Sequence, residues 1–417
     1  VVVVAAITYL ALRGLARSRI GAAMVAVREH ERAAVALGIP AGTIRWLGFV
    51  VSGALAGLAG ALTAFQLQAV AVEQFHPLSA LPILSVAVVG GIESLWGGVL
   101  GAALLTAGPE LLRDASPTQA GALPPAVLLL VVAFRPAGLA SLGRIPLLRR
   151  TVVLPAGEIA LPPGSDRDGS AAPESPAGDP LLVEGVDVTF GRFRAVDGMS
   201  LTVGPGEVVA LIGPNGAGKT TLFDCISGFV TPDAGRISLG AVRLDRLRPT
   251  RRVGAGCGRT FQSGGLCPRL SLRDNVELAL RWHRVAGVSA DGLLDAAGIV
   301  STDAPAAEVP PGIARTAEIV RVLALEPRLL LLDEPTAGLN RSESDRLVQL
   351  VREHAVRAAV LVIEHDLRVV AGADRLVVMD RGRLLAAGHP DAVRRDPKVI
   401  EAYLGPPTAE PAPRPAG

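Results

Sequence analysis

The sequence of 417 residues is poor in cysteine, in net charge and in lysine, and these shortages exclude several classes of protein. Three cysteines in so long a chain exclude a disulfide framework. Cys225, Cys257 and Cys267 also lack the C-x-x-C spacing of a metal site, so we expect reduced thiols in a cytosolic environment. A net charge of +2 leaves no basic surplus to follow a nucleic-acid backbone, which argues against nucleic acid as a partner. Among 41 basic residues only Lys219 and Lys398 are lysines.

Half of the residues are apolar and the mean hydropathy is +0.42, but this hydrophobicity is concentrated before residue 138. Three nearly charge-free stretches, 46–70, 81–107 and 120–134, meet or approach the roughly 20 residues that cross a bilayer. The apolar run from Val1 is shorter, and we interpret it as the end of a membrane helix that begins before the sequence does. The composition thus predicts a transmembrane part over residues 1–144.

An arginine-rich loop lies before the first of these stretches, with six arginines between residues 13 and 45. Such a short basic loop is typical of the cytoplasmic side of a membrane. Within it, residues 24–37 form a helix-compatible amphipathic segment. This segment either lies along the membrane surface or docks on a cytoplasmic partner, and docking is the sharper hypothesis.

The number of membrane crossings constrains the structure of the middle apolar stretch, residues 81–107. Because the basic loop and the polar half after residue 144 both belong in the cytoplasm, an even number of crossings must join them, whereas three stretches give an odd number. The middle stretch is interrupted by Gly90, Gly91, Glu93, Gly97 and Gly98. We therefore predict that it is broken into two short helices or re-enters the membrane. G-x-x-x-G steps at 53–57 and 97–101 predict close backbone approach.

The composition changes again in the second half of the chain. Residues 145–180 are rich in proline, glycine, serine and aspartate, which is typical of a flexible linker. From 181 to 405, short β-like runs alternate with helical segments, as in an α/β domain. Residues 406–417 form a proline-rich tail that we expect to be disordered.

The strongest motif, G-x-x-x-x-G-K-T, follows a strand-like run at 208–212 and precedes a helix-compatible run. It comprises Gly213, Pro214, Asn215, Gly216, Ala217, Gly218, Lys219 and Thr220, with Thr221 directly after it. In this context backbone N–H groups surround the β-phosphate, Lys219 reaches the β- and γ-phosphates, and the Thr220 hydroxyl ligates Mg²⁺. The motif predicts a site for ATP with Mg²⁺.

A run of four leucines at 329–332 predicts a buried strand that delivers Asp333 and Glu334 to the sheet edge where nucleotides bind. By their chemistry, Asp333 would hold the Mg²⁺ shell and Glu334 would polarise the attacking water as general base. Alone, such a run is usually structural. Downstream of a phosphate loop, the functional interpretation is favoured.

The order of these motifs resembles that of the ATP-binding subunit of an ABC transporter over residues 181–405. The resemblance rests on the phosphate loop and on four further motifs, at 259–262, 332–335, 337–340 and 364–366.

The resemblance also implies roles for single residues. Gln262 would contact Mg²⁺ and the attacking water, and His365 would lie near the γ-phosphate. Asn340 would fall in the D-loop, and Phe190 would lie under the adenine; the alternative for Phe190 is a place in the core.

Other segments narrow the resemblance to importers of branched-chain amino acids. Residues 258–262 and 396–405 resemble their ATP-binding subunits. In the apolar half, the segments at 28–34, 36–38, 94–97 and 134–139 resemble the C-terminal half of their permease subunit. The resemblance implies that residues 13–44 contain the cytoplasmic coupling segment that contacts an ATPase, with Arg28, Glu29, Glu31 and Arg32 as its charged members.

One motif departs from the family. Where the family has a Leu-Ser/Ala-x-Gly-Gln signature loop, this chain reads Val-Pro-Pro-Gly-Ile, and only Gly312 is kept. Pro310 and Pro311 lack an N–H and Ile313 offers no polar group to a phosphate. We expect the ATP site closed by this loop to turn over poorly, while the site that contains Glu334 hydrolyses ATP.

The predicted fold class is therefore multidomain, with an α-helical transmembrane permease fragment and an α/β P-loop ABC ATPase domain that has a helical subdomain. The expected function is ATP-driven import of branched-chain or related amino acids across the plasma (inner) membrane, with the ATPase in the cytoplasm. The implied partners are a second ATPase, a second permease, an extracytoplasmic solute-binding protein and the bilayer.

Three alternatives stay open. The chain is a regulatory subunit that hydrolyses weakly, an importer of another solute such as urea or amides, or an ABC ATPase of repair or translation, against which the apolar stretches argue.

Overall fold

A computed structural model of the chain describes residues 1–68, 80–92, 94–113, 117–135, 138–139, 178–300, 302–365 and 367–404. Glu93, the predicted tail 406–417 and all but the last three residues of the predicted linker 145–180 lie outside the described residues. The chain forms two compact units. One contains residues 1–21 and 46–151, and the other contains residues 22–45 and 152–417.

The first unit is helical. Its elements are α1 (Val2–Arg17), most of α4 (Ala41–Leu67), α5 (Ala80–Gly90), α6 (Leu95–Ala102), a π-helical turn (Ala103–Ala107), α7 (Gly108–Arg113) and α8 (Pro117–Phe134). Within the described residues, one helix, Ala41–Gln66, is both long and apolar enough to cross a membrane. The apolar helices at Leu81–Gly90 and Leu123–Phe134 are shorter.

The predicted break in the middle apolar stretch is confirmed. The stretch forms α5 and α6 with a non-helical junction between them, where Ser94 caps α6 by accepting from the Gly97 N–H at 3.1 Å. A Cβ atom on Gly97 would lie 2.2 Å from the Gly90 carbonyl oxygen, and one on Gly101 would lie 2.3 Å from that of Val86. The step at 97–101 thus lets two backbones touch, whereas Gly53 and Gly57 have open space beside them.

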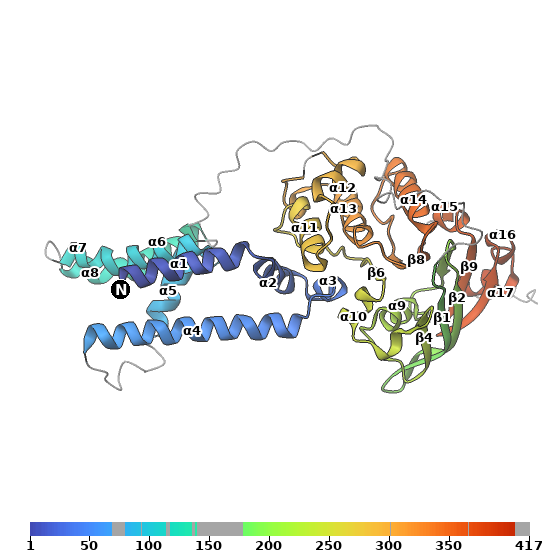
Figure 1. Cartoon of the computed structure of the whole chain (residues 1–417), viewed down its shortest axis with the longest axis horizontal. Helices are drawn as coiled ribbons and strands as arrows, with labels where there is room; N and C mark the ends of the chain where they lie inside the picture. Colours follow the sequence, from blue (N-terminus) through green and yellow to red (C-terminus); the bar gives the residue numbers. More distant parts are fainter. Residues whose placement is uncertain are drawn as a thin grey trace, which may run out of the picture. The chain divides into compact units, whose positions relative to one another are not determined.

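Residues 22–45 of the arginine-rich segment belong to the second unit. They contain most of α2 (Arg19–Glu29) and all of α3 (Glu31–Ala36), which are separated at His30. The His30 ring caps α3 by accepting from the Ala33 N–H at 3.3 Å. In Figure 1, α3 lies beside α10 (Pro249–Gly254).

Two sheets form the rest of this unit (Figure 1). The four-stranded antiparallel sheet has the order β2-β1-β4-β5, and its strands are β1 (Leu181–Phe190), β2 (Phe193–Val203), β4 (Ala234–Leu239) and β5 (Val242–Arg243). The six-stranded sheet has the order β10-β9-β3-β8-β7-β6 and is parallel except for β10. Its strands are β3 (Val208–Ile212), β6 (Cys257–Arg259), β7 (Leu329–Asp333), β8 (Ala359–Ile363), β9 (Arg375–Asp380) and β10 (Arg383–Gly388).

Helices cover the parallel sheet and form a helical subdomain. They are α9 (Lys219–Ser227), α10, α11 (Leu272–His283), α12 (Ala290–Ala296), α13 (Pro311–Leu323), α14 (Arg341–Ala355), α15 (Leu367–Ala371), α16 (Pro390–Val393) and α17 (Pro397–Leu404), with short 3-10 turns at Leu244–Arg246 and Ala306–Glu308. Helices α11, α12 and α13 pack on one another as the helical subdomain.

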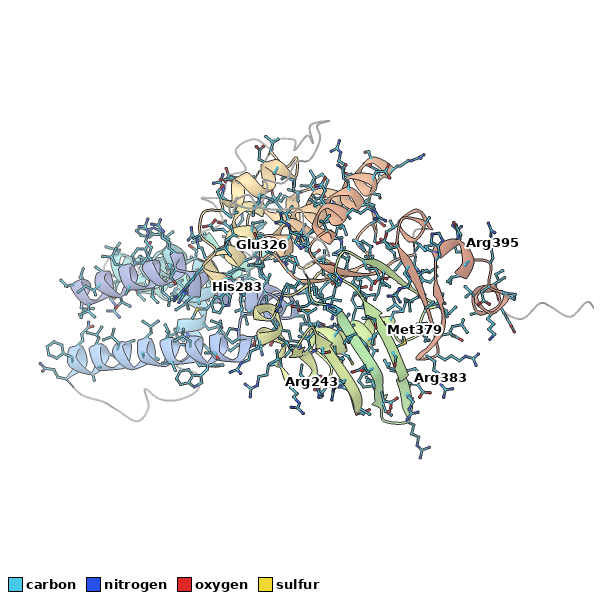
Figure 2. All side chains as sticks on the ribbon, turned by 45° about the vertical axis from the view of Figure 1, so that its right-hand side comes forward. Arg243, His283, Glu326, Met379, Arg383 and Arg395 are labelled. Atoms are coloured by element: carbon cyan, nitrogen blue, oxygen red, sulfur yellow. The ribbon has the colours of Figure 1, made fainter. Side chains whose placement is uncertain are left out.

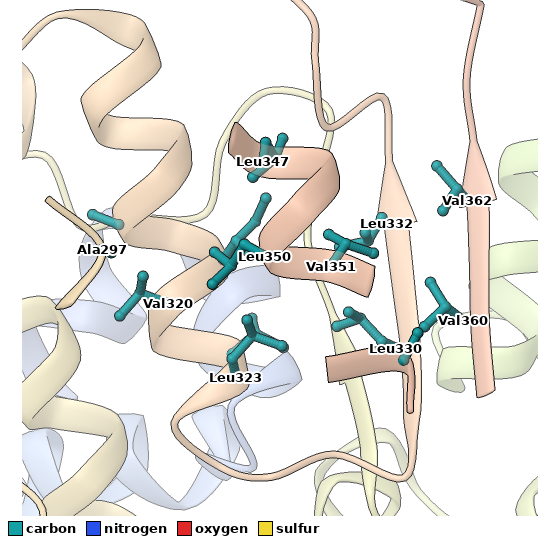
Figure 3. Packing of buried hydrophobic residues seen from close by; sticks show 14 of the residues in the cluster. Ala297, Val320, Leu323, Leu330, Leu332, Leu347, Leu350, Val351, Val360 and Val362 are labelled. Atoms are coloured by element: carbon teal, nitrogen blue, oxygen red, sulfur yellow. The ribbon is translucent and has the colours of Figure 1, made fainter. Parts of the chain in front are cut away.

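Strand β7 shows why the leucine run forms a central strand. Parallel strands buried on both faces read as continuous apolar runs, and every residue of β7 is buried. Leu330 and Leu332 belong to the core cluster that includes Leu347 and Leu350 of α14 and Val320 of α13 (Figure 3). Leu329 and Leu331 belong to the other cluster, with residues of α9. Because β7 is packed on both faces, the backbone position of Glu334, which directly follows the strand, is fixed.

Candidate functional site

The phosphate-loop motif joins the end of a parallel strand to the start of a helix. β3 ends at Ile212 and α9 begins at Lys219, with Gly218 at the N-cap in a left-handed conformation (φ 99°). A Cβ atom on Gly213 would lie 2.1 Å from the carbonyl oxygen of Met379, which Figure 2 labels, and one on Gly218 would lie 2.2 Å from that of Ala195. Only glycine fits at these two positions. The N-terminus of α9 favours negative charge, such as phosphate, in this loop.

Lys219 is 7% exposed, and its Nζ donates to the carbonyl oxygens of Gly213 at 2.7 Å and Pro214 at 3.1 Å. Burial lowers the pKa of this ammonium, while the carboxylates of Glu334 and Asp333 oppose that shift. The ammonium therefore lies inside the loop and in the field of the two carboxylates that end β7.

Asp333 is 4% exposed at the C-terminal end of β7. Burial raises its carboxyl pKa, and Arg259, whose Nη2 lies 3.8 Å from the carboxylate, acts against that shift. The Asp333 N–H donates to the Thr260 hydroxyl at 3.3 Å. The residues of β6 and the turn after it therefore hold Asp333 in place.

Glu334 adopts a left-handed backbone conformation (φ 47°), which costs a residue with a side chain about 1–3 kcal/mol and is common at functional sites. Its Oε2 accepts from Gln262 Nε2 at 3.0 Å, and its Oε1 lies 3.5 Å from His365 Nε2. The three residues that the sequence predicts to be catalytic are thus brought together. Their side chains come from three separate parts of the chain.

Arg315 holds the backbone beneath this group. Buried at the first turns of α13, it donates to the carbonyl oxygens of Phe261, Asp333, Glu334 and Pro335, and to Glu318 at 2.7 Å. Glu318 accepts from the Phe261 N–H at 3.1 Å. This buried pair fixes the loop before Gln262 to the turn that carries Glu334. The sequence shows both residues, but it does not reveal this bracing role.

A second bracing residue, Glu364, also escaped the sequence argument. It is 3% exposed, accepts from the N–H and hydroxyl of Thr336 and, at 2.9 Å, from the N–H of His365. Its position directly before His365 is the available sequence signal. It ties the strand that precedes His365 to the segment after Glu334.

The remaining predicted ATP contacts lie at the edges of the site. Thr220 and Asn215 are exposed and Thr221 is half-buried. Phe190 is 53% exposed at the end of β1, so the alternative that places it in the core is wrong. Asn340 is exposed and caps α14 with Glu343 in a reciprocal capping box.

The altered signature loop leads directly into α13. Pro310 is the N-cap without a side-chain hydrogen bond, Pro311 is the first helical residue and Ile313 is 2% exposed. A Cβ atom on Gly312 would lie 2.7 Å from the carboxylate of Glu343. This helix start thus has two prolines without an N–H and a carboxylate nearby, two features that disfavour phosphate.

The predicted docking of the arginine-rich segment is observed within the second unit. Ala26, Leu37 and Ile39 are buried in one apolar cluster with Cys267 and Leu278.

Polar contacts frame this apolar cluster. The Leu37 carbonyl lies 2.8 Å from Nε2 of His283, which is labelled in Figure 2, and the Gly38 carbonyl accepts from Trp282 Nε1 at 3.2 Å. The segment therefore packs on α11 of the ATPase domain.

The charged members of the segment divide into two groups. Arg32 bonds both oxygens of Asp224 at 2.8 Å, and Glu29 accepts from the Arg269 N–H at 3.2 Å. Glu31 pairs with Arg45 in its own segment and Arg28 is exposed on α2. Arg32 and Glu29 thus bind the segment to the ATPase domain.

The donors expected for Mg²⁺ are all oxygens: the Thr220 hydroxyl, the Asp333 carboxylate and the Gln262 amide oxygen. Such hard ligands suit Mg²⁺, which is usually held by one or two carboxylates together with substrate phosphates and waters. The residues present fit the ion.

Comparison with protein families gives three matches. Residues 1–133 match the branched-chain amino acid transport system permease component, residues 196–337 match the ABC transporter family, and residues 383–405 match the branched-chain amino acid ATP-binding cassette transporter.

Curated relatives agree. The chain is 36% identical over 250 residues to the high-affinity branched-chain amino acid transport ATP-binding protein LivG of Escherichia coli, covering 54% of this chain and 98% of that protein. It is also 36% identical over 251 residues to BraF of Pseudomonas aeruginosa, a protein of the same description, covering 54% and 97%. A solved nucleotide-free ATP-binding cassette from an ABC transporter is 28% identical and covers 55% of this chain and 100% of that one, with a TM-score of 0.49.

The ATP-binding half is an ATP hydrolase domain of the ABC type, which confirms the predicted enzyme class. The other half is a permease domain, which confirms the predicted multidomain fold class. The chain belongs to the branched-chain amino acid ABC transporter family and joins a permease domain and an ATP-binding domain in one polypeptide.

Proposed function

We propose that this chain couples ATP hydrolysis to import of branched-chain or related amino acids across the plasma (inner) membrane. The single observation that carries the proposal is the union of both halves in one chain. A permease domain of this transport system is joined to an ATPase domain, and its arginine-rich segment is docked on that ATPase. Residues 1–144 would form the permease part, with the coupling segment at 13–44, and residues 181–405 the ATPase.

The site supports hydrolysis by Glu334. Its carboxylate would accept a proton from the attacking water as the water adds to the γ-phosphorus and the bond from that phosphorus to the bridging β–γ oxygen breaks, which releases ADP and inorganic phosphate. Gln262 donates to one oxygen of this carboxylate at 3.0 Å and His365 Nε2 lies 3.5 Å from the other, and these two contacts would orient it toward the water. Lys219 and the backbone of 213–218 would bind the phosphates, and Phe190 would stack on the adenine. Bound Mg²⁺ would neutralise phosphate charge.

Further components follow from the transport function. A second ATPase would complete each ATP site, a second permease would complete the pathway, and an extracytoplasmic binding protein would deliver the solute. The ATPase domain would lie in the cytoplasm. Solute classes such as urea or amides are the alternative cargo.

The altered loop at 309–313 favours a second candidate, a regulatory subunit that binds ATP and hydrolyses it weakly. The two candidates differ in which site is active. As an active subunit, the chain would hydrolyse ATP at Glu334, and only the opposite site, closed by Pro310, Pro311 and Gly312, would be slow.

The test uses the full-length chain in lipid nanodiscs with its partner subunits, the partner ATPase carrying an inactivated catalytic glutamate. We expect the binding protein loaded with leucine, isoleucine or valine to stimulate ATP hydrolysis several-fold over the unloaded protein. Loss of all stimulation when the partner alone is inactivated would instead establish the regulatory role. Stimulation by a urea-loaded or amide-loaded binding protein, and not by one loaded with these amino acids, would identify urea or amides as the transported solute.

A further inference from the structure

Asp224 is shared by two arginines that come from different domains of the chain. Arg32, from the docked segment, bonds both of its oxygens at 2.8 Å through Nη2. Arg259, at the end of β6, bonds Oδ1 through Nη1 at 2.6 Å. Asp224 lies on α9, the helix that begins at Lys219. The Arg32–Asp224 contact joins residues that are 192 positions apart in the sequence. It connects the docked segment to the helix that follows the phosphate loop.

Arg259 also faces the site. Its Nη2 lies 3.8 Å from Asp333 Oδ2, and its side chain is only 3% exposed. Arg32, Asp224, Arg259 and Asp333 therefore form a row of alternating charges, which we call the charge row. The row runs from the permease segment to the carboxylate proposed to hold Mg²⁺. Arg259 and Asp333 are buried, so water screens their interaction little, whereas Arg32 is 53% exposed and water screens its pair with Asp224 more strongly.

Aromatic rings hold the two guanidinium groups of the charge row in place. Arg32 lies 4.9 Å from the ring centre of Phe229, and Arg259 lies 4.9 Å from that of Phe261 and 5.6 Å from that of Phe229. These stacked positions favour arginine over lysine. The Arg259 guanidinium therefore lies between two carboxylates, with Nη1 bonded to Asp224 and Nη2 facing Asp333.

We propose that the charge row makes Arg259 a positioning residue for Asp333, and that the docked Arg32 sets how far Arg259 neutralises Asp333. When Arg32 occupies both oxygens of Asp224, Asp224 attracts Arg259 less and leaves it beside Asp333. When Arg32 is absent, Asp224 binds Arg259 more fully and Asp333 keeps more negative charge for the cation. The docked Arg32 side chain, through Asp224, thus weakens the hold on Mg²⁺. This inference rests on the proposed role of Asp333.

Two substitutions that break the same ion pair are therefore expected to act in opposite directions. Arg32→Gln lowers the Mg²⁺ concentration that gives half-maximal tight binding, because Arg259 moves toward Asp224. Asp224→Asn raises it, because Arg259 is released to Asp333. We expect each substitution to change this half-maximal Mg²⁺ concentration by about fivefold or more, the usual range for coupled sites. A purely structural ion pair would shift both variants in the same direction.

The measurement is equilibrium binding of a fluorescent ADP analogue to the purified full-length chain over a range of Mg²⁺ concentrations. It requires no turnover. Binding without Mg²⁺ checks that each variant is folded, and we expect wild-type affinity there. In the double variant the charge row is already broken at Asp224, so we expect the Mg²⁺ dependence of Asp224→Asn alone. If the two effects instead cancel, a simple through-space field explains them and the charge row is contradicted.

Two matched variants serve as controls. Arg45→Gln removes the same charge from the same segment, where its partner is Glu31. Glu29→Gln weakens a different polar contact of the segment with the ATPase domain, the one to Arg269. Both should leave the Mg²⁺ dependence within about twofold of wild type, which is below the usual range for coupled sites. An equal shift in Glu29→Gln would mean that docking in general acts, which overturns the proposal.

Other outcomes are also decisive. If Arg32→Gln leaves the Mg²⁺ dependence unchanged, the inference is wrong although the proposed function stands. If wild-type binding gains nothing from Mg²⁺, the proposed nucleotide site itself is wrong. If Asp224→Asn loses metal-free ADP binding, Arg32→Glu replaces it, and its shift should match Arg32→Gln in direction and exceed it in size.

Discussion

Replacing Glu334 by glutamine is expected to lower ATP hydrolysis by the assembled transporter by about 10²–10³-fold, within the range for loss of a general base. The amide keeps the hydrogen-bonding shape of the side chain but cannot accept the proton of the attacking water. The side chains that contact this carboxylate in the described residues are Gln262 and His365, and neither of them is an acid. ATP affinity should stay within about twofold of wild type, because Lys219 and the phosphate loop are unchanged.

Steady-state hydrolysis and equilibrium ATP binding are measured together for this variant. Glu353→Gln is the matched control, because Glu353 lies on α14 and contacts only Gln349 among the described hydrogen bonds. It should behave as wild type. Hydrolysis by Glu334→Gln above about a third of the wild-type rate would contradict the proposed asymmetry, since the opposite site would then carry the activity.

Replacing Arg315 by methionine is expected to destabilise the ATPase domain by about 3–5 kcal/mol, the usual cost of leaving one partner of a buried ion pair alone. Glu318 would keep a buried charge, and the carbonyl oxygens of Asp333 and Glu334 would lose their donor. The turn that holds Glu334 in its left-handed conformation would lose its support. ATP hydrolysis should therefore fall together with stability.

Thermal unfolding of the full-length chain, followed by loss of ADP binding, measures this effect. Arg352→Met is the control, because its pair with Asp374 is exposed and spans 3.6 Å, and such pairs contribute at most about 1 kcal/mol. In Arg315→Met with Glu318→Leu, removing the second charge should restore part of the stability. If the two single variants at Arg315 and Arg352 lose equal stability, the bracing role is wrong.

The sequence was sufficient to predict the elements that depend on local patterns. The four leucines before Asp333 form a strand because an apolar run of that length suits a parallel sheet buried on both faces. The glycines and the single charged residue, Glu93, at 90–98 predict the break that separates α5 from α6. The phosphate loop is predicted by a motif in which a side chain cannot replace glycine at close backbone contacts. At Gly213, for example, a Cβ atom would overlap the Met379 carbonyl oxygen.

Contacts between distant segments were beyond such patterns. The amphipathic segment at 24–37 predicts a docking face, but it does not show that the face meets α11 of its own chain. In the sequence, Asp224 is an ordinary acidic residue of a helical segment. Its two partners, Arg32 and Arg259, are far from it in the sequence, so no local pattern reveals them. Likewise, the G-x-x-x-G steps at 53–57 and 97–101 are alike in sequence, and only the second meets another backbone.

Under the proposed function, one polypeptide uses ATP hydrolysis at Glu334 to move an amino acid through its own permease domain. The most direct measurement is the initial rate of labelled leucine accumulation in proteoliposomes that contain the full-length chain and its partner subunits, with the loaded binding protein on the opposite side from ATP and Mg²⁺. We predict accumulation that requires ATP and is abolished by Glu334→Gln. Accumulation without ATP, or at the wild-type rate in Glu334→Gln, would contradict the account.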